Sequence, residues 1–177
     1  MSMPSASPLN KIYRGRVWVF GDSIDTDGIA PFYLYRDPEE MYKHTLESFR
    51  PEFPKQVRSG DIVVAGKNFG CGSARPPTPI FRIGVSAIVV ESLAPLMLRN
   101  SVGLAYPVFI APGVTSIVQD HQTIEIDYPN GVVRNLDTGR QVALRKYPPI
   151  VERIYAAGGI IPYTRQRYLQ EQARRSP

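Results

Sequence analysis

Residues 61–73 read DIVVAGKNFGCGS, a short apolar run followed directly by a glycine-rich stretch. The apolar run is bounded by polar residues and glycine, which is typical of a buried strand. Runs of the same kind recur at 87–90 and 108–111, with segments of helical character between them. A chain that alternates strand and helix in this way predicts a parallel sheet flanked by helices. We expect the following residues to be buried in one sheet: Val63, Val64, Ile88, Val89, Val90, Val108 and Phe109.

Further elements are predicted around this core. Residues 16–20 alternate in character and are rich in valine and aromatic side chains, which favours a strand. The Asp-Pro pair at 37–38 is typical of an N-cap and first helical residue, and predicts a helix to about Phe49. After the glycine-rich stretch we expect one helix that ends near Gly84 and another over about 93–101.

The last third of the chain predicts a small antiparallel part and a final helix. Residues 123–127 alternate, and the Pro-Asn-Gly sequence at 129–131 favours a hairpin turn. A second turn is expected at 138–139. The proline pair at 148–149 opens an amphipathic segment, which we expect to form a helix that the glycines at 158–159 end.

Length and composition predict one soluble domain. The chain has 177 residues, 43% hydrophobic and 21% charged, which is ordinary for a globular protein. No apolar run approaches the roughly 18–20 residues that span a bilayer, and residues 1–10 lack a secretory signal pattern. We therefore expect a cytoplasmic protein with no membrane partner. We expect one domain over 1–177, with flexible tails at 1–12 and 166–177.

The charge and the cysteine count restrict the possible ligands. The net charge is +5, but the basic residues form no stripe, and we expect no nucleic-acid partner. Four arginines lie in a polar segment near the C-terminus: Arg165, Arg167, Arg174 and Arg175. A positive surplus also suits a small di- or tricarboxylate. One cysteine, Cys71, cannot form an intrachain disulfide, a structural zinc site or an iron–sulfur cluster.

The stretch 70–79, between a predicted strand and a predicted helix, is the best candidate for chemistry. Its glycines let backbone N–H groups approach a ligand closely, and a helix N-terminus attracts anions. Arg75 carries a guanidinium that can hold a carboxylate through two parallel hydrogen bonds. These features indicate an anion or carboxylate site. A glycine-rich loop with a surface arginine fits these ten residues equally well.

Residues 67–75, KNFGCGSAR, resemble the NFGCGSSRE signature of isopropylmalate dehydratase and homoaconitase small subunits. Residues 21–27, GDSIDTD, are similar to the family's GDDIDTD motif, and residues 60–66, GDIVVAG, to its GDIIVAG strand. Similar matches follow at 84–92, 99–100, 130–132 and 157–160. The resemblance extends in order over about residues 14–168.

This resemblance implies an aconitase-type swivel domain, an α/β fold in β/β/α layers with a mainly parallel core sheet and a small antiparallel hairpin part. It implies no cofactor or metal on this chain, and a large partner subunit that holds a [4Fe–4S] cluster. The implied reaction is dehydration and rehydration of a hydroxy-dicarboxylate such as 3-isopropylmalate, a step of leucine biosynthesis. Homoaconitase, dimethylmalate dehydratase and a non-catalytic swivel subunit remain alternatives.

The resemblance also implies roles for individual residues. Ser73 matches the family's catalytic base, and Arg75 matches the arginine that binds the substrate carboxylate, with Gly72 and Ala74 beside them. A serine hydroxyl acts as a base only where N–H groups and cations stabilise its alkoxide. Residues 33–36, YLYR, lie where the family has its specificity loop, and of these Tyr35 and Arg36 are the candidates for substrate binding. Arg36 would there bind a distal carboxylate, although a solvated arginine before the helix N-cap fits equally well.

The chain departs from the family signature after Ser73. Residues 73–79 read SARPPTP where the family has SSREHAP, so the second serine, the glutamate and the histidine are replaced. Because each proline disfavours helical geometry in the preceding residue, the helix is expected to begin near Pro77 or Pro79, with Arg75 on a loop.

Four other residues are interpreted as structural rather than catalytic or metal-binding: His44 and His121 on the surface, and Asp25 and Asp27 bonded to loop backbone.

Overall fold

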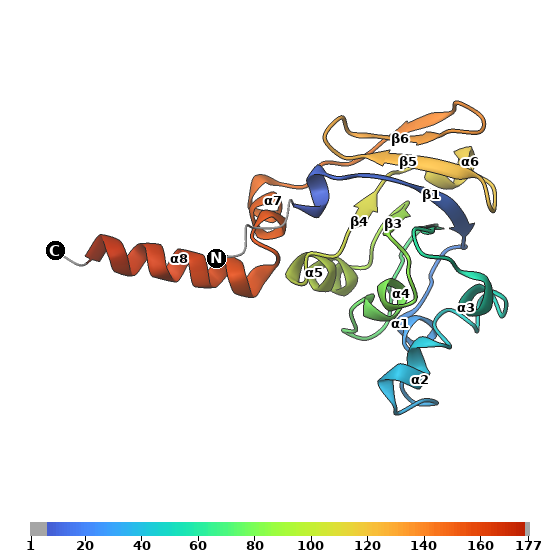
Figure 1. The fold of residues 1–177 in the computed structure, drawn as a ribbon, viewed down its shortest axis with the longest axis horizontal. Coiled ribbons are helices and arrows are strands. Elements are labelled where there is room, and N and C mark those ends of the chain that lie inside the picture. Colours follow the sequence, from blue (N-terminus) through green and yellow to red (C-terminus); the bar gives the residue numbers. More distant parts are fainter. Residues whose placement is uncertain (1–6, 176–177) are drawn as a thin grey trace.

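A computed structural model describes residues 7–175, whose strands form one curled sheet in the order β4-β3-β2-β1-β5-β6-β7 (Figure 1). The strands are β1 (Ile12–Val19), β2 (Ile62–Ala65), β3 (Ala87–Val90), β4 (Val108–Ile110), β5 (Thr123–Asp127), β6 (Val132–Asn135) and β7 (Gln141–Ala143). The helices are α1 (Thr26–Ile29), α2 (Pro38–Tyr42), α3 (Phe53–Gln56), α4 (Thr78–Arg82), α5 (Pro95–Gly103), α6 (Val114–Ile117), α7 (Pro149–Ala156) and α8 (Ile160–Arg175), after a 3-10 turn at Pro8–Asn10.

Strands β1 to β4 pair in parallel and form the predicted core. Val63 lies opposite Ile88, which lies opposite Val108, so the three apolar runs are neighbours in one sheet. All seven residues predicted for this sheet are fully buried, which confirms the prediction. The strands are apolar throughout because both of their faces are covered. Alternate residues of β2 pack on opposite faces of the sheet, with Val64 in one hydrophobic cluster and Val63 in the other.

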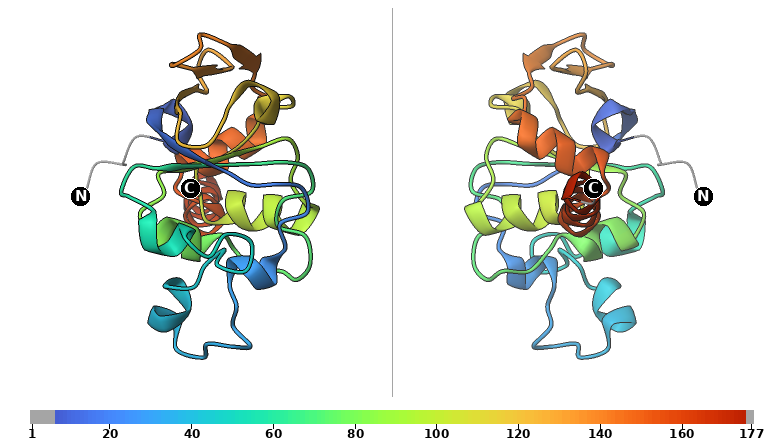
Figure 2. Two further views of the ribbon diagram at one scale, coloured as in Figure 1. Left: turned by 90° about the vertical axis from the view of Figure 1, so that its right-hand side faces the viewer. Right: turned by 90° about the vertical axis from the view of Figure 1, so that its left-hand side faces the viewer.

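Strand β1 joins this parallel half to an antiparallel half. Its residues 17–19 pair with β2 in parallel, whereas residues 12–16 pair with β5 in the opposite direction. Gly15 lies where the two halves meet, and a Cβ on it would be 2.2 Å from the carbonyl oxygen of Gly60. The β5-β6-β7 part folds over one face, and helices α1, α3, α4 and α5 pack on the other with α2 against α4, which gives the expected β/β/α layers (Figure 2). The antiparallel half holds three of the six strand pairings and is larger than a hairpin.

Helix α2 ends at Tyr42, although the sequence predicted a helix to about Phe49. The chain beyond it forms turns, because Leu46 has a left-handed backbone with φ 60° and its amide donates to the carbonyl of Gly28. The hydroxyl of Thr45 donates to the carbonyl of Ile29 in the same place. These contacts to α1 replace the hydrogen bonds that would have continued the helix.

The helix after the glycine-rich loop begins at Thr78, as the prolines predicted, so Arg75 lies on the loop. Helix α7 also lies where a last helix was expected, but the sequence analysis missed α8. Gly158 and Gly159, with φ 86° and 120°, turn the chain between α7 and α8. Helix α8 projects from the body and includes residues 166–175 of the predicted C-terminal tail (Figure 1).

The predicted N-terminal tail, residues 1–12, is structured from Ser7 onward, since Leu9 is buried and Ile12 begins β1. Residues 1–6 and 176–177 lie outside the described residues.

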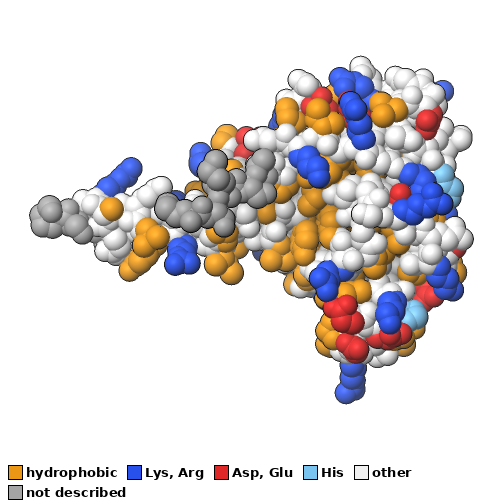
Figure 3. All heavy atoms as spheres, in the orientation of Figure 1, with side chains coloured by type: hydrophobic (Ala, Val, Ile, Leu, Met, Phe, Trp, Pro, Cys, Tyr) orange, Lys and Arg blue, Asp and Glu red, His pale blue; other side chains and the backbone are white. Residues whose placement is uncertain are grey.

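Within residues 7–175, no helix has the length and apolarity needed to cross a membrane. On the face drawn in Figure 3, Lys and Arg side chains are scattered and form no continuous stripe.

The buried carboxylate of Asp61, 4% exposed, fastens β1 to the start of β2. It accepts hydrogen bonds from Arg16 at 2.6 Å, from the Trp18 indole at 2.8 Å and from the Arg58 amide at 2.9 Å. Burial by itself would raise the pKa of Asp61. The hydrogen bonds and the positive charge of Arg16 outweigh burial and hold the pKa below its ordinary value.

Replacing Asp61 with Asn should lower the free energy of unfolding by about 2–4 kcal/mol, because Arg16 loses its buried partner. Since the pKa of Asp61 is depressed on folding, its contribution is present above about pH 4 and is lost as the pH falls further. Urea titrations of both proteins between neutral and acidic pH would measure the difference. The exposed N-cap variant Asp37→Asn is the control, because asparagine caps a helix as well as aspartate. Equal stability of Asp61→Asn and Asp37→Asn would contradict the prediction.

Candidate active site

Loops that follow three parallel strands meet at one edge of the sheet. The loop after β2 is held on one side by the loop after β1, where the Gly70 amide donates to the carbonyl of Ile24 at 2.7 Å and the Thr26 amide to Cys71 at 2.9 Å. On its other side, the Phe69 amide donates to the carbonyl of Ser92 after β3 at 3.0 Å. The carboxyl edge of parallel strands is where open α/β folds bind ligands. The glycine-rich loop is therefore fixed at a place suited to a ligand.

Two glycines of this loop cannot carry a side chain. Gly70 has φ 75°, and a Cβ on it would lie 2.4 Å from the side chain of Met97. Gly72 has φ 101°, and its Cβ would lie 2.9 Å from the hydroxyl oxygen of Thr26. A left-handed backbone strains other residues. These two glycines let the chain pass close to α5 and α1 and present Ser73 and Ala74 on the exposed side.

Ser73 is exposed, and its hydroxyl oxygen lies 3.1 Å from that of Thr26. The backbone amide of Ser73 donates to the same Thr26 oxygen at 3.0 Å. Thr26 is 1% exposed and begins α1, whose N-cap Asp25 accepts from the Gly28 amide at 2.7 Å. The sequence reasoning missed Thr26 as a partner of Ser73, although it lies in the GDSIDTD stretch. The bond from Gly28 agrees with the expectation for Asp25.

Arg75 is half-buried and is held by two acceptors. Its Nη1 forms an ion pair with Asp27 and donates to the carbonyl of Ala30 at 3.1 Å. In the described part of the chain, Nε and Nη2 of Arg75 have no hydrogen-bond partner, so this edge of the guanidinium can hold a carboxylate. Asp27 was expected to bond loop backbone. That expectation was wrong, because its carboxylate lies beside Arg75, 48 residues along the chain.

Within residues 7–175, neither candidate from the specificity loop is hydrogen-bonded to Ser73 or Arg75, although Tyr35 lines a cavity together with Asp27. The ring of Tyr35 stacks on His44 with centroids 3.9 Å apart, and the His44 Nδ1 lies 2.5 Å from a carboxylate oxygen of Glu47. His44 is thus partly covered rather than a free surface histidine. Arg36 is exposed, and no hydrogen bond or ion pair joins it to another residue within 7–175. The structure therefore joins Ser73 and Arg75 through Thr26 and Asp27, and does not bring Arg36 to them.

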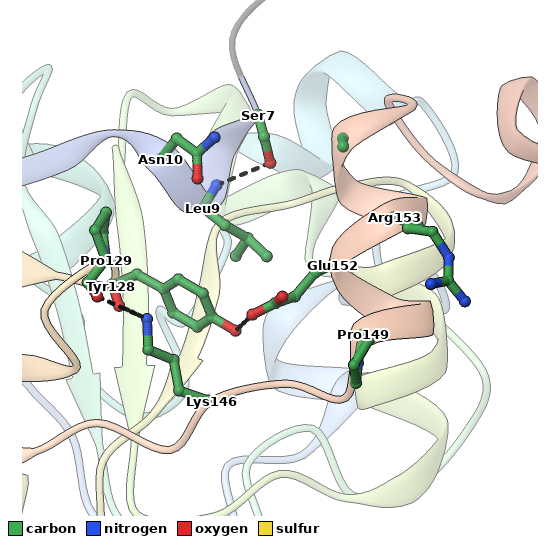
Figure 4. A pocket seen from close by; sticks show the side chains of 10 residues that line it. Ser7, Leu9, Asn10, Tyr128, Pro129, Lys146, Pro149, Glu152 and Arg153 are labelled. Atoms are coloured by element: carbon green, nitrogen blue, oxygen red, sulfur yellow. Dashed lines mark hydrogen bonds between the residues drawn. The ribbon is translucent and has the colours of Figure 1, made fainter.

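A cavity of about 360 Å³ adjoins Arg75. It lies between α2 and the start of α4, and its other lining residues are Ala30, Phe32, Met41, Tyr42, Pro76, Thr78 and Pro79. A second, larger cavity of about 500 Å³ lies between the N-terminal 3-10 turn, the β5–β6 hairpin and α7 (Figure 4). None of the predicted site residues lines this second cavity.

Polar groups in the larger cavity hold α7 to the sheet. Burial raises the pKa of Tyr128 well above its ordinary value, so its hydroxyl stays protonated and donates to Glu152 of α7 at 2.8 Å. The same hydroxyl accepts from the Tyr147 amide at 2.7 Å. Lys146 donates to the backbone carbonyls of Tyr128 and Pro129 (Figure 4). These groups satisfy one another, which is the pattern of a structural contact.

The residues of this chain do not fit an iron–sulfur cluster. Such a cluster is held by about four cysteine thiolates, whereas the chain has only Cys71. The Cys71 thiol donates to the carbonyl of Ser23 at 3.5 Å. Within the described residues, no group of three or more His, Cys, Asp or Glu side chains is placed to hold a metal ion.

Comparison with known proteins gives consistent results. Residues 33–106 match the family described as the aconitase C-terminal domain. The chain is 45% identical over 157 residues to 3-isopropylmalate dehydratase small subunit 1 of Methanopyrus kandleri, covering 86% of this chain and 92% of that protein. It is 36% identical over 168 residues to the isopropylmalate/citramalate isomerase small subunit of Methanocaldococcus jannaschii, covering 93% and 100% of the two chains.

The fold agrees with a solved relative. The crystal structure of 3-isopropylmalate dehydratase from Methanocaldococcus jannaschii matches with a TM-score of 0.80 and 31% identity, covering 93% of this chain and 99% of that one. The predicted swivel-type α/β fold is thereby confirmed. With near-complete coverage in sequence and structure, the chain belongs to the family of 3-isopropylmalate dehydratase small subunits.

Proposed function

We propose that this chain is the small subunit of a two-subunit hydro-lyase that removes and re-adds water on a hydroxy-dicarboxylate. The observation that carries the proposal is that Ser73 and Arg75 lie on one loop and are each bonded to a residue of α1, Ser73 to Thr26 and Arg75 to Asp27. The names of the relatives refer to 3-isopropylmalate and citramalate, which are malates that carry an alkyl group. We take this class as the substrate.

The proposed role of Ser73 is to remove a proton from the carbon beside a carboxylate. Such a carbon is a weak acid, so the step needs a positioned base and stabilisation of the charge that develops. The Thr26 hydroxyl, 3.1 Å from that of Ser73, can donate to the Ser73 oxygen when that oxygen is charged. On protonation of Ser73 this hydrogen bond weakens, and the proton can return to the product.

The proposed role of Arg75 is to hold the carboxylate next to the reacting carbon. Asp27 and the Ala30 carbonyl fix Nη1, so the guanidinium is oriented before the substrate arrives. Nε and Nη2 then donate to the two carboxylate oxygens. Because Arg75 is already oriented, little side-chain freedom is lost on binding.

A partner subunit is needed because Ser73 is open to water in this chain. Water would solvate the alkoxide and weaken the electrostatic stabilisation that a covered site provides. We propose that the large subunit covers the loop and carries the [4Fe–4S] cluster. To this chain we assign only the base and the carboxylate-binding group.

The purified chain should show no iron–sulfur absorbance and no dehydratase activity, even after anaerobic treatment with iron and sulfide. Addition of the large subunit from the same organism should restore turnover of 3-isopropylmalate or citramalate. Absorbance spectra and an assay of the unsaturated intermediate would measure both. Turnover by this chain alone would refute the division of roles.

In the two-subunit enzyme, Ser73→Ala should lower kcat about 10²–10⁴-fold with little change in KM, because it removes the base but not the carboxylate contact. Steady-state kinetics would measure both constants. Ser116→Ala on α6 is the control, since this exposed hydroxyl donates to the Gly113 carbonyl and is no part of the proposed site. A near-normal kcat for Ser73→Ala would favour a non-catalytic small subunit.

Arg75→Lys should raise KM roughly 10–100-fold, because an ammonium lacks the planar pair of parallel N–H donors that binds both oxygens of a carboxylate. The exposed Arg167→Lys on α8 is the matched control and should keep normal constants. If Arg75→Lys also keeps its normal KM, Arg75 does not bind the substrate.

A further inference from the structure

Helix α8 extends away from the body of the protein (Figure 1). Only its first turn adjoins another helix closely, at the end of α5, where a Cβ on Gly103 would lie 3.7 Å from the Ile160 side chain. From Thr164 to Arg174 every residue is exposed. A lone helix of about 12–15 residues is marginally stable in water, and helices in proteins are stabilised mainly by packing one face. Within the described residues, this part of α8 lacks such a packed face.

The exposed apolar side chains of α8 lie on one side of the helix. Tyr168 and Leu169 follow Ile161 by seven and eight positions, and this spacing places all three on one face. They are 60%, 57% and 78% exposed respectively, and Figure 3 draws hydrophobic side chains along the lower side of the projecting helix. Gln166 and Gln170 lie on the other side, where they line a groove of about 410 Å³ with α7. The apolar stripe, Ile161, Tyr168 and Leu169, is therefore turned away from the rest of the chain.

The stripe is too small to hold two copies of the chain together. The helix has 16 residues, so it is about 24 Å long and roughly 11 Å across. Half of the side of such a cylinder is about 400 Å², whereas a stable interface buries about 800 Å² on each partner. Residues 160–175 also carry four arginines and one glutamate, so paired copies would set like charges against each other. Size and charge both favour a larger partner with an acidic surface around an apolar groove.

Helix α5 connects the base of α8 to the candidate active-site loop. At one end, Met97 packs beneath Gly70, whose added Cβ would lie 2.4 Å from it. At the other end, Leu104 lies beside Gly159 and is 53% exposed, which extends the apolar surface at the base of α8. The rise along the helix from Met97 to Gly103 is about 9 Å, whereas an interface of about 800 Å² is roughly 30 Å across. A subunit that covers the loop is therefore large enough to reach α8 as well.

We infer that α8 is a docking helix for the large subunit, which receives the apolar stripe in a groove rimmed by acidic residues. Burial of the three apolar side chains supplies most of the free energy of this contact. Arg165 lies between Ile161 and Leu169 on the same side of the helix and pairs with a carboxylate of the rim. The inference rests on the proposed function, because it takes the large subunit as the partner that covers the Ser73 loop. It adds a second contact at the opposite end of α5.

Amide hydrogen exchange of the full chain, alone and with the large subunit from the same organism, tests this contact. In the free chain, amides of residues 164–174 should exchange fast, because every residue there is exposed. The large subunit should slow their exchange by at least about tenfold. Residues 70–75 should also be protected, as the proposed function requires. Protection of 70–75 without protection of 164–174 would overturn the inference and leave the proposed function standing, whereas protection of neither would refute both.

Tyr168→Ala combined with Leu169→Ala should raise the Kd for the large subunit at least about tenfold, because the stripe loses most of its apolar surface. At saturating large subunit, kcat should stay within about twofold of wild type, since the reacting loop is unchanged. Alanine favours helix formation, so weaker binding would not reflect a lost helix. Arg165→Glu should weaken binding by a similar factor at low salt. The matched control, Gln166→Ala with Gln170→Ala, should bind as the wild type does.

Titration calorimetry would measure the Kd and a steady-state assay the kcat. Normal binding by the Tyr168–Leu169 double variant would overturn the inference while the proposed function stands. Two other results would also overturn it: dimers of the free chain, seen in sedimentation, that the double variant dissociates, or binding to phosphatidylglycerol vesicles that the double variant loses. The first would place a second copy on the stripe, and the second a membrane. A wild-type chain that neither binds nor activates the large subunit would refute the proposed function itself.

Discussion

Parallel pairing of β1 with β2 is the constraint on which the site depends. Because both strands end at the same edge of the sheet, the loops that follow them lie side by side and exchange backbone hydrogen bonds. Asp61 secures this pairing at the other end of β2 by accepting hydrogen bonds from Arg16 and Trp18 of β1. The register of β1 on β2 therefore places the loop that carries Ser73 beside the loop that leads into Thr26.

The site divides the work between a displayed pair and a supporting pair. Ser73 is exposed and Arg75 half-buried, and each is bonded to a residue of α1, the buried Thr26 and the exposed Asp27 respectively. A side chain that is already oriented loses less conformational entropy when a ligand binds to it. Ser73 is exposed in this chain, which is why the proposed function has the large subunit cover the loop.

The three prolines after Arg75 change both the backbone and the chemistry of the site. They delay α4 until Thr78, which leaves Arg75 on a loop where Asp27 and the Ala30 carbonyl hold it. Pro76 and Pro79 also contribute apolar surface to the cavity beside Arg75. The departure from the family signature therefore changes both where α4 begins and the surface beside Arg75.

The sequence by itself determined the features that depend on near neighbours. Apolar runs identified β2, β3 and β4, proline sterics predicted the late start of α4, and the glycine-rich motif identified Ser73 and Arg75 as candidates. Only the tertiary structure decided the rest. Thr26 and Asp27 meet their partners 47 and 48 residues away, and contacts to α1 end α2 early. Such contacts follow from how strands and helices pack, and no local pattern of residues records them.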